Sequence, residues 1–270
     1  MVEVPQGDDA GFNEWMEKYM SIFTDPKDME DPDTIRRYWE AGTAILYMVE
    51  AEMQADDQRI IRKKIGMTLT VINENVPDAA YVPYAGIDKE FQGIGSYSRA
   101  LLHNEEALQR RGVKVVMIDC EDGTRLDGFR EAYPGKTDVQ IAKRCNERLH
   151  FWIKNGYVFV DNDPDVQYCR PRSDDTAQIQ AYDLQGIRIL GQDSEYEQYF
   201  LLDAAGKKTH ITKAGYRKLY LALHTIDERS DGNEADLRSR FPAIDNFLTA
   251  LDASSKNEFA LFKDAIADKK

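Results

Sequence analysis

The chain has 270 residues, of which 42% are hydrophobic and 31% are charged, and its formal net charge at pH 7 is −13. This acidic balance repels phosphate backbones and argues against general nucleic-acid binding, whereas it suits a cationic or amine-bearing substrate, or plain solubility. No run of about 18 apolar residues occurs, so no membrane span is expected. The acidic N-terminus lacks the apolar core of a signal peptide, which leads us to expect a cytoplasmic protein.

The three cysteines, Cys120, Cys145 and Cys169, are widely spaced and form no CxxC pair. An odd number without a secretory signal favours a reducing compartment over a disulfide framework. The four histidines do not cluster with the cysteines, so no metal site is expected. Cys145 has two readings, a nucleophile or a buried structural thiol, and the lack of a recognisable histidine and acid relay favours the second.

The hydrophobic pattern predicts alternating helices and strands between two helical ends. In chain order, the expected elements are a helix over 9–24, a short helix from Pro32 or Asp33 to about Glu40, strands over 43–53 and 59–73, an extended segment over 80–87, a helix over 97–111, a strand over 113–121, a helix from about Val139 to Asn155, a strand over 157–161 and a last strand within 183–192. This alternation indicates an α/β layer structure.

Beyond about Asp203 the pattern is predicted to be helical. The expected apolar faces are formed by Tyr216, Leu219, Tyr220, Leu223 and Ile226, by Phe241, Ile244, Phe247, Leu248 and Leu251, and by Phe259, Phe262 and Ile266. The chain is therefore divided into an N-terminal helical segment (1–42), a central domain (43–203) and a helical C-terminal extension (204–270). The outer segments are expected to cap the edges of the sheet, with shaping of an acceptor site and a dimer surface as alternatives.

A glycine turn, "QGIGSY", opens the helix over 97–111. Glycines between a strand and a helix expose backbone N–H groups at the positive end of the helix, and such donors suit a phosphate. Gly93 and Gly95 also let the chain approach oxygens that a Cβ would block, although two glycines alone fit simple turn chemistry as well. No Lys-Ser or Lys-Thr follows, which excludes a P-loop, and the third glycine of a dinucleotide fingerprint is absent.

The stretch "IDKEFQGIGSYSRALL" resembles motif A of the GNAT acyltransferase superfamily, in which an acid and an aromatic residue precede Arg/Gln-x-x-Gly-x-Gly/Ala. The residues that fit this form are Ile87, Glu90, Phe91, Gln92 and Gly95. "FWIKNGY" is similar to the later Phe-Tyr-x-x-x-Gly-Phe signature of the family, and "KIGMTLTV" is similar to the strand ahead of motif A. The order and spacing of these pieces agree over roughly residues 43–160.

The resemblance implies an α/β, GNAT-like fold whose mixed, mostly antiparallel sheet is flanked by helices and splays open beside the strand ending at Ile87. It implies acetyl-CoA or another acyl-CoA as co-substrate, lying in that splay. The pantetheine arm would pair with the backbone of Ala85, Gly86 and Ile87. The diphosphate would take the N–H groups of Gln92, Gly93, Ile94, Gly95, Ser96 and Tyr97. An amine would attack the thioester directly, so positioning and deprotonation would supply most of the catalysis.

Some residues depart from the family pattern. Tyr97 takes the place of the last Gly/Ala of motif A and is expected to point away from the phosphates. Trp152 takes the place of a frequent Tyr that protonates the leaving thiolate; an indole cannot act as that acid, and Trp152 is kept as a substrate-binding candidate. Asn146 lies one residue out of step with an Asn that often contacts CoA.

The candidates for a general base are Asp119 and Glu121, which end the strand over 113–121 and are expected to point the same way. The alternative for both is the start of a solvated loop. Tyr84 precedes the segment expected to pair with CoA and is a candidate for lining the acceptor pocket, with packing as the alternative. The long loop over 122–138 is expected to close over the acceptor or the adenosine, or to be a surface insertion.

Two functions follow as hypotheses. The first is an N-acyltransferase, expected to transfer acetyl, that acts on a small-molecule amine or a protein amine; longer acyl-CoA or acyl carrier protein as donor is its near variant. The second is a non-catalytic acyl-CoA-binding module that works through its helical tail. Neither nucleic acid nor membrane is expected as a partner, and homodimer formation is left open.

Overall fold

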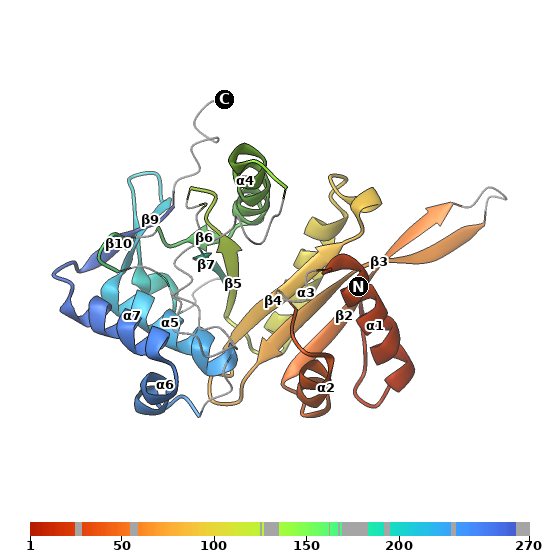
Figure 1. Ribbon diagram of the computed structural model, residues 1–270, viewed down its shortest axis with the longest axis horizontal. Coiled ribbons are helices and arrows are strands. Elements are labelled where there is room, and N and C mark those ends of the chain that lie inside the picture. Colours follow the sequence, from red (N-terminus) through yellow and green to blue (C-terminus); the bar gives the residue numbers. More distant parts are fainter. Residues whose placement is uncertain are drawn as a thin grey trace. The chain divides into compact units, whose positions relative to one another are not determined.

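The computed structural model describes residues 1–24, 29–54, 59–124, 126, 135–161, 163–166, 168, 183–191, 195–227 and 231–262. They belong to two compact units, Met1–Val113 and Lys114–Lys270, each with its own strands and helices (Figure 1). The boundaries predicted at residues 42 and 203 stay a prediction. Within the described ranges, no helix is long and apolar enough to cross a membrane.

The first unit is an antiparallel sheet with helices on both faces. Its elements are β1 (Val2–Glu3), α1 (Asp9–Ile22), α2 (Pro32–Glu40), β2 (Ala44–Gln54), β3 (Ile60–Ile72), β4 (Ala79–Ile87), the 3-10 helix η2 (Lys89–Phe91) and α3 (Ser96–Arg110). The strands lie in the order β1-β2-β3-β4, and each neighbouring pair is antiparallel. Ile22 of α1 covers Gly86 on one face, whereas Tyr97 of α3 contacts Thr68 on the other.

The two N-terminal helices begin where the sequence predicts, because carboxylates cap their first amides. Asp8 accepts a hydrogen bond from the N–H of Gly11, and Asp31 accepts one from Thr34, with Pro32 in the first turn of α2. The apolar stripe of α1 buries Phe12, Trp15, Met16 and Tyr19. The spacing of these apolar residues by three and four predicts an amphipathic helix, and their burial against the sheet stabilises it.

The second unit contains two antiparallel sheets and four helices within its described residues. Its elements are β5 (Val115–Glu121), α4 (Asp138–Lys154), β6 (Val158–Phe159), β7 (Asp183–Ile189), the 3-10 helix η4 (Glu197–Tyr199), β8 (Phe200–Leu202), β9 (Lys208–Thr212), α5 (Lys213–Asp227), α6 (Glu234–Arg240), α7 (Pro242–Ala253) and β10 (Glu258–Ala260). One sheet has the order β5-β7-β6, and the other has the order β10-β9-β8. The prediction of a mixed α/β fold with mostly antiparallel strands and flanking helices is confirmed.

The predicted helical C-terminal extension contains α5, α6 and α7, and the faces expected over 216–226 and 241–251 lie on α5 and α7, but the prediction was wrong for β9 and β10, which are strands. The hairpin β8–β9 turns at Asp203, whose side chain accepts hydrogen bonds from the N–H groups of Ala205 and Lys207, while Gly206 takes a left-handed φ of 75°. Phe259 lies in β10 and not in a helix, because Glu258 and Ala260 on either side of it are exposed, which is the alternation of a strand. Ile266 lies outside the described residues.

The C-terminal segment packs into the second unit and does not simply cap an edge. Gln185 of β7 donates its side-chain N–H to the carbonyl of Leu219 in α5, with 3.3 Å between the two atoms. The segment after β10 runs along β6, since Leu261 bridges Val160 and the N–H of Phe262 donates to Phe159. Strands of the predicted central domain therefore share one core with helices of the predicted extension.

Candidate functional site

The turn between β4 and α3 has the geometry expected of an anion-binding loop. Gly93 and Gly95 both have φ of 81°, and Gly95 is the N-cap of α3. A Cβ added at either glycine would meet no atom within 4 Å, so the space in front of the loop is open. The left-handed conformation requires glycine at these positions, and the open space would admit a ligand.

The loop presents a set of backbone donors. Among the described residues, no group accepts a hydrogen bond from the N–H of Gly93, Ile94, Gly95, Ser96 or Ser98. The first turn of α3 carries no acidic residue that would compete for these donors. Because the dipole of a 15-residue helix adds positive potential at the same place, the loop suits a phosphate or diphosphate.

Gln92 shapes the loop and does not belong to its open donors. Its N–H donates to the carbonyl of Lys89 at 3.3 Å, and its side-chain amide donates to the carbonyl of Ile87 at 3.1 Å. These two bonds fold the chain back at the end of β4. The donors available to a ligand therefore begin at Gly93, one residue later than the sequence predicts.

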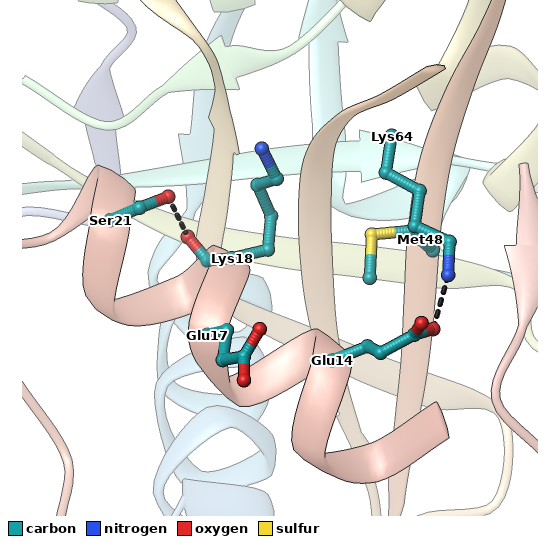
Figure 2. A pocket seen from close by; sticks show the side chains of 6 residues that line it. All are labelled: Glu14, Glu17, Lys18, Ser21, Met48 and Lys64. Atoms are coloured by element: carbon teal, nitrogen blue, oxygen red, sulfur yellow. Dashed lines mark hydrogen bonds and ion pairs between the residues drawn. The ribbon is translucent and has the colours of Figure 1, made fainter. Parts of the chain in front are cut away.

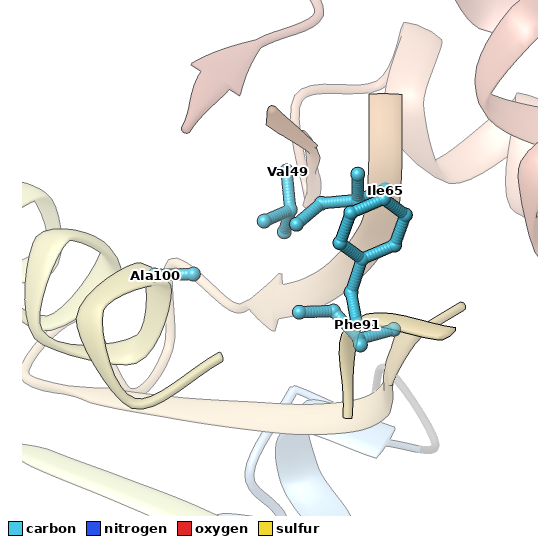
Figure 3. Packing of buried hydrophobic residues seen from close by; sticks show 5 residues of the cluster. Val49, Ile65, Phe91 and Ala100 are labelled. Atoms are coloured by element: carbon cyan, nitrogen blue, oxygen red, sulfur yellow. The ribbon is translucent and has the colours of Figure 1, made fainter. Parts of the chain in front are cut away.

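A small apolar cluster packs next to the start of the glycine loop. Figure 3 shows Val49 of β2, Ile65 of β3, Phe91 of η2 and Ala100 of α3, and the cluster also contains Ile87 of β4. Phe91 and Ile87 flank the start of the turn, so burying them fixes where the following glycines lie. Phe91, the aromatic residue of the motif, therefore has a packing role.

Tyr97 reaches toward the sheet and not into the open space. Its hydroxyl lies 3.1 Å from the hydroxyl of Thr68 on β3, which is itself buried. Burial raises the pKa of Tyr97 above its ordinary value, although the hydrogen bond with Thr68 lowers it, so the phenol stays neutral. This contact agrees with the expectation that the side chain of Tyr97 points away from the phosphates.

The last residues of β4 lie beside α1. Tyr84 makes edge-on ring contacts with Tyr19 and Phe23, at centroid distances of 5.1 and 5.2 Å. Between Tyr81 and Tyr84 the pairing of β4 with β3 shifts by one residue, a bulge at Val82–Pro83 that the missing N–H of proline favours. On this edge, Ala85, Gly86 and Ile87 pair with β3. The predicted pairing with pantetheine concerns the other edge and stays a prediction.

The two candidate bases at the end of β5 contact different partners within the second unit. The hydroxyl of Tyr168 donates to Asp119 Oδ1 at 2.5 Å. Glu121 forms an ion pair with Arg148 of α4, with 2.5 Å between Oε1 and Nη2. The positive charge of Arg148 offsets the negative charge of Glu121, whereas the contact of Asp119 with Tyr168 is a hydrogen bond from a phenol.

The remaining candidates of the second unit lie on α4. Cys145 is fully buried, and burial raises the pKa of its thiol to about 11, which favours the structural reading over the nucleophile. The side chain of Asn146 lies over Gly123 just after β5, where an added Cβ would be 2.6 Å from its Oδ1. Trp152 is half-buried between Phe151 and Tyr157, with edge-on ring contacts to both.

Most of the loop over 122–138 lies outside the described residues, including Arg125, Phe129, Arg130 and Tyr133, and so does Cys169. Among the described residues, no three side chains of His, Cys, Asp or Glu come together in a way that would hold a metal ion. Tyr168 and Arg148 were missed by the sequence reasoning. Tyr168 lies in a polar stretch without periodicity, and no local pattern indicates its partner.

A hollow of about 320 Å³ lies beside α1 in the first unit, and none of its lining residues belongs to the glycine loop (Figure 2). Its lining residues are Glu14, Glu17, Lys18, Ser21, Met48 and Lys64. Lys64 forms an ion pair with Glu14, and Lys18 forms one with Asp88 at 2.9 Å. The lysines of this hollow are thus already neutralised by carboxylates of the chain.

No protein-family model matches the sequence, and no curated protein matches it either. Among solved structures, the chain is similar to a putative acetyltransferase of the GNAT family from Bacteroides thetaiotaomicron, with a TM-score of 0.51 and 17% identity over 84% of this chain and 98% of that one. It is also similar to an aminoglycoside 6'-N-acetyltransferase complexed with coenzyme A, with a TM-score of 0.45 and 10% identity over 72% of this chain and 100% of that one. The chain has the fold of the GNAT acetyltransferases.

Proposed function

We propose that the protein is an N-acyltransferase that moves an acyl group, in the first instance acetyl, from acyl-CoA to an amine. The observation that carries the proposal is the set of open amides of Gly93, Ile94, Gly95, Ser96 and Ser98, in the part of a GNAT fold where the sequence resembles motif A. At these identities the structural likeness concerns the fold alone, so donor, acceptor and activity are part of the proposal. The open loop is assigned to the diphosphate of the coenzyme.

In the proposed reaction, the amine nitrogen attacks the thioester carbonyl carbon, the carbon–sulfur bond breaks, and the coenzyme leaves as a thiolate. The proton that the amine loses goes to a carboxylate, for which we favour Asp119 over Glu121, because Arg148 neutralises Glu121. The thiolate takes its proton from water, since the indole of Trp152 offers no suitable acid. Holding the reactants in place supplies most of the rate.

A non-catalytic acyl-CoA-binding module is the second candidate, and two observations favour it. Trp152 stands where the family pattern has an acid, and both candidate bases already have partners in Tyr168 and Arg148. Such a protein would bind the coenzyme through the same loop without turnover. Activity and binding therefore have to be measured separately.

The test incubates the protein with acetyl-CoA and a panel of amines, covering small polyamines, amino acids and peptides with free N-termini or lysines. Release of free thiol that depends on the amine supports the transferase. Parallel arms with longer acyl-CoA and with acyl carrier protein as donor identify the near variant. Binding of CoA without thiol release in any arm would instead support the binding module.

A further inference from the structure

Tyr168 lies outside the resembling motifs and contacts the candidate base Asp119 directly. Its side chain is 1% exposed, and its hydroxyl donates to Asp119 Oδ1 at 2.5 Å. The bond fixes one oxygen of Asp119, and with it the orientation of the whole carboxylate.

The ring of Tyr168 is held by helices of the C-terminal segment. It makes an edge-on contact with Tyr220 of α5 at 5.8 Å and lies nearly parallel to His224 at 6.5 Å. Tyr220 in turn stacks on Phe247 of α7, with ring centroids 3.8 Å apart. All of these rings are buried, so packing leaves Tyr168 little freedom to turn away from Asp119.

The strand that carries Asp119 is also tied to α5 through its neighbour. Gln185 of β7 lies directly opposite Asp119 in the pairing of β5 with β7. Its fully buried side chain donates to the carbonyl of Leu219 in α5. Helix α5 therefore supports the position of Asp119 both through the ring of Tyr168 and through the adjacent strand.

We infer that Tyr168 is a positioning residue for Asp119, and that α5 is part of the support of the base. This inference rests on the proposed acyl transfer. A base must be held within about 0.5 Å of the position from which it takes the proton, and a carboxylate free to rotate loses that geometry. Tyr168 acts through Asp119 and needs no contact with either substrate.

The experiment is a double-mutant cycle on kcat, with acetyl-CoA and the best amine of the panel. Tyr168→Phe keeps the ring and removes only the hydroxyl; we expect kcat to fall about ten-fold while KM for acetyl-CoA stays the same. In the Asp119→Asn background, Tyr168→Phe should change kcat less than two-fold, because the residue through which it acts is gone. Tyr196→Phe, which removes another buried hydroxyl of the second unit, is the matched control and should keep the wild-type kcat.

Each other outcome overturns the inference. Wild-type kcat in Tyr168→Phe shows that the bond has no role in the reaction. An equal ten-fold loss in both backgrounds shows a general structural effect, which thermal melting of the same variants would also register. Wild-type kcat in Asp119→Asn removes Asp119 as the base but leaves the transferase intact, whereas a wild-type protein without turnover on any amine overturns the proposed function as well.

Discussion

Tyr97 shows how one residue can depart from a motif and keep its geometry. The position follows Ser96 in the first turn of α3, where a side chain can turn either toward the ligand or back onto the sheet. The hydrogen bond with Thr68, at 3.1 Å, keeps it on the sheet. A second contact on the same face, from the side-chain amide of Asn104 to Thr70 at 3.4 Å, fixes the helix along β3.

We predict that Tyr97→Phe lowers the free energy of unfolding by about 1–2 kcal/mol, because the buried hydroxyl of Thr68 loses its partner. The double variant with Thr68→Val removes both hydroxyls together and should cost less than the sum of the two single changes. Urea unfolding followed by circular dichroism measures all three. Additive costs would show that the two hydroxyls do not stabilise each other in the folded protein.

At the scale of elements, α5, α6 and α7 are joined by a network of ion pairs. The carboxylate of Glu234 accepts hydrogen bonds from Nη1 and Nη2 of Arg217, at 2.7 and 2.6 Å, and it also pairs with Arg238. Arg238 extends the network to Asp245 and Asp252 of α7. The bond from Arg217 is the largest cause that lowers the pKa of Glu234 below its ordinary value.

We predict that Glu234→Gln destabilises the protein by about 1 kcal/mol near neutral pH, a figure reduced for the partial exposure of these side chains. The pKa of Glu234 is lower in the folded than in the unfolded state, so its stabilising effect is present above the unfolded pKa and is lost as pH falls through the folded one. Urea unfolding at pH 7 and at pH 3 should show the difference between variant and wild type shrinking at the lower pH.

Glu195→Gln is the control for this prediction, since Glu195 pairs with Lys218 on the exposed surface of the same unit. It should change stability by less than about 0.5 kcal/mol. A Glu234→Gln difference that is as large at pH 3 as at pH 7 would mean that charge on Glu234 does not contribute to stability.

Elements that depend on local periodicity were predictable from the sequence, and those that depend on distant pairing were not. The stripe of α1 and the capped start of α2 follow from apolar spacing and from Asp31 before Pro32. Phe259 and Phe262 fit a helical spacing equally well, and only pairing with β9 makes the first of them part of a strand. The short strands β8 and β9 were missed because their signal is the Asp203 turn and not a hydrophobic pattern.

At the scale of the whole molecule, the C-terminal segment contributes core residues and not an added surface. Leu219, Leu223 and Ile226 of α5 are fully buried. Their burial, together with the hydrogen bond from Gln185, completes the unit that contains the end of β5.

We therefore predict that a chain ending at Asp203 does not fold cooperatively, because it leaves the apolar faces of β6 and β7 uncovered. A chain ending at Phe262 retains every described contact and should unfold with the same transition as the full chain. Thermal unfolding followed by circular dichroism compares the two. A soluble 1–203 chain with a cooperative transition would show that the C-terminal segment is dispensable for the fold.

The candidate site could be predicted from the sequence only where its chemistry is local. Gly93 and Gly95 predict a turn before a helix, and the structure has such a turn, with a positive φ at both glycines. The partners Tyr168 and Arg148 come from other segments of the chain, and no sequence pattern connects them to β5. The strand pattern alone identified Asp119 and Glu121 as base candidates. It could not predict that Asp119 contacts Tyr168 and that Glu121 contacts Arg148.

The binding of CoA by the wild type, Gly95→Asp and Gly112→Asp, measured by isothermal titration calorimetry, tests the central claim that the open amides before α3 hold a diphosphate. Gly112 is the matched control because it also has a positive φ, 88°, and open space around its Cβ position, but it follows the other end of α3. We predict that Gly95→Asp weakens CoA binding at least ten-fold, about 1.4 kcal/mol, because its carboxylate occupies the anion's place. Gly112→Asp should bind like the wild type, and equal affinities in all three proteins would contradict the account.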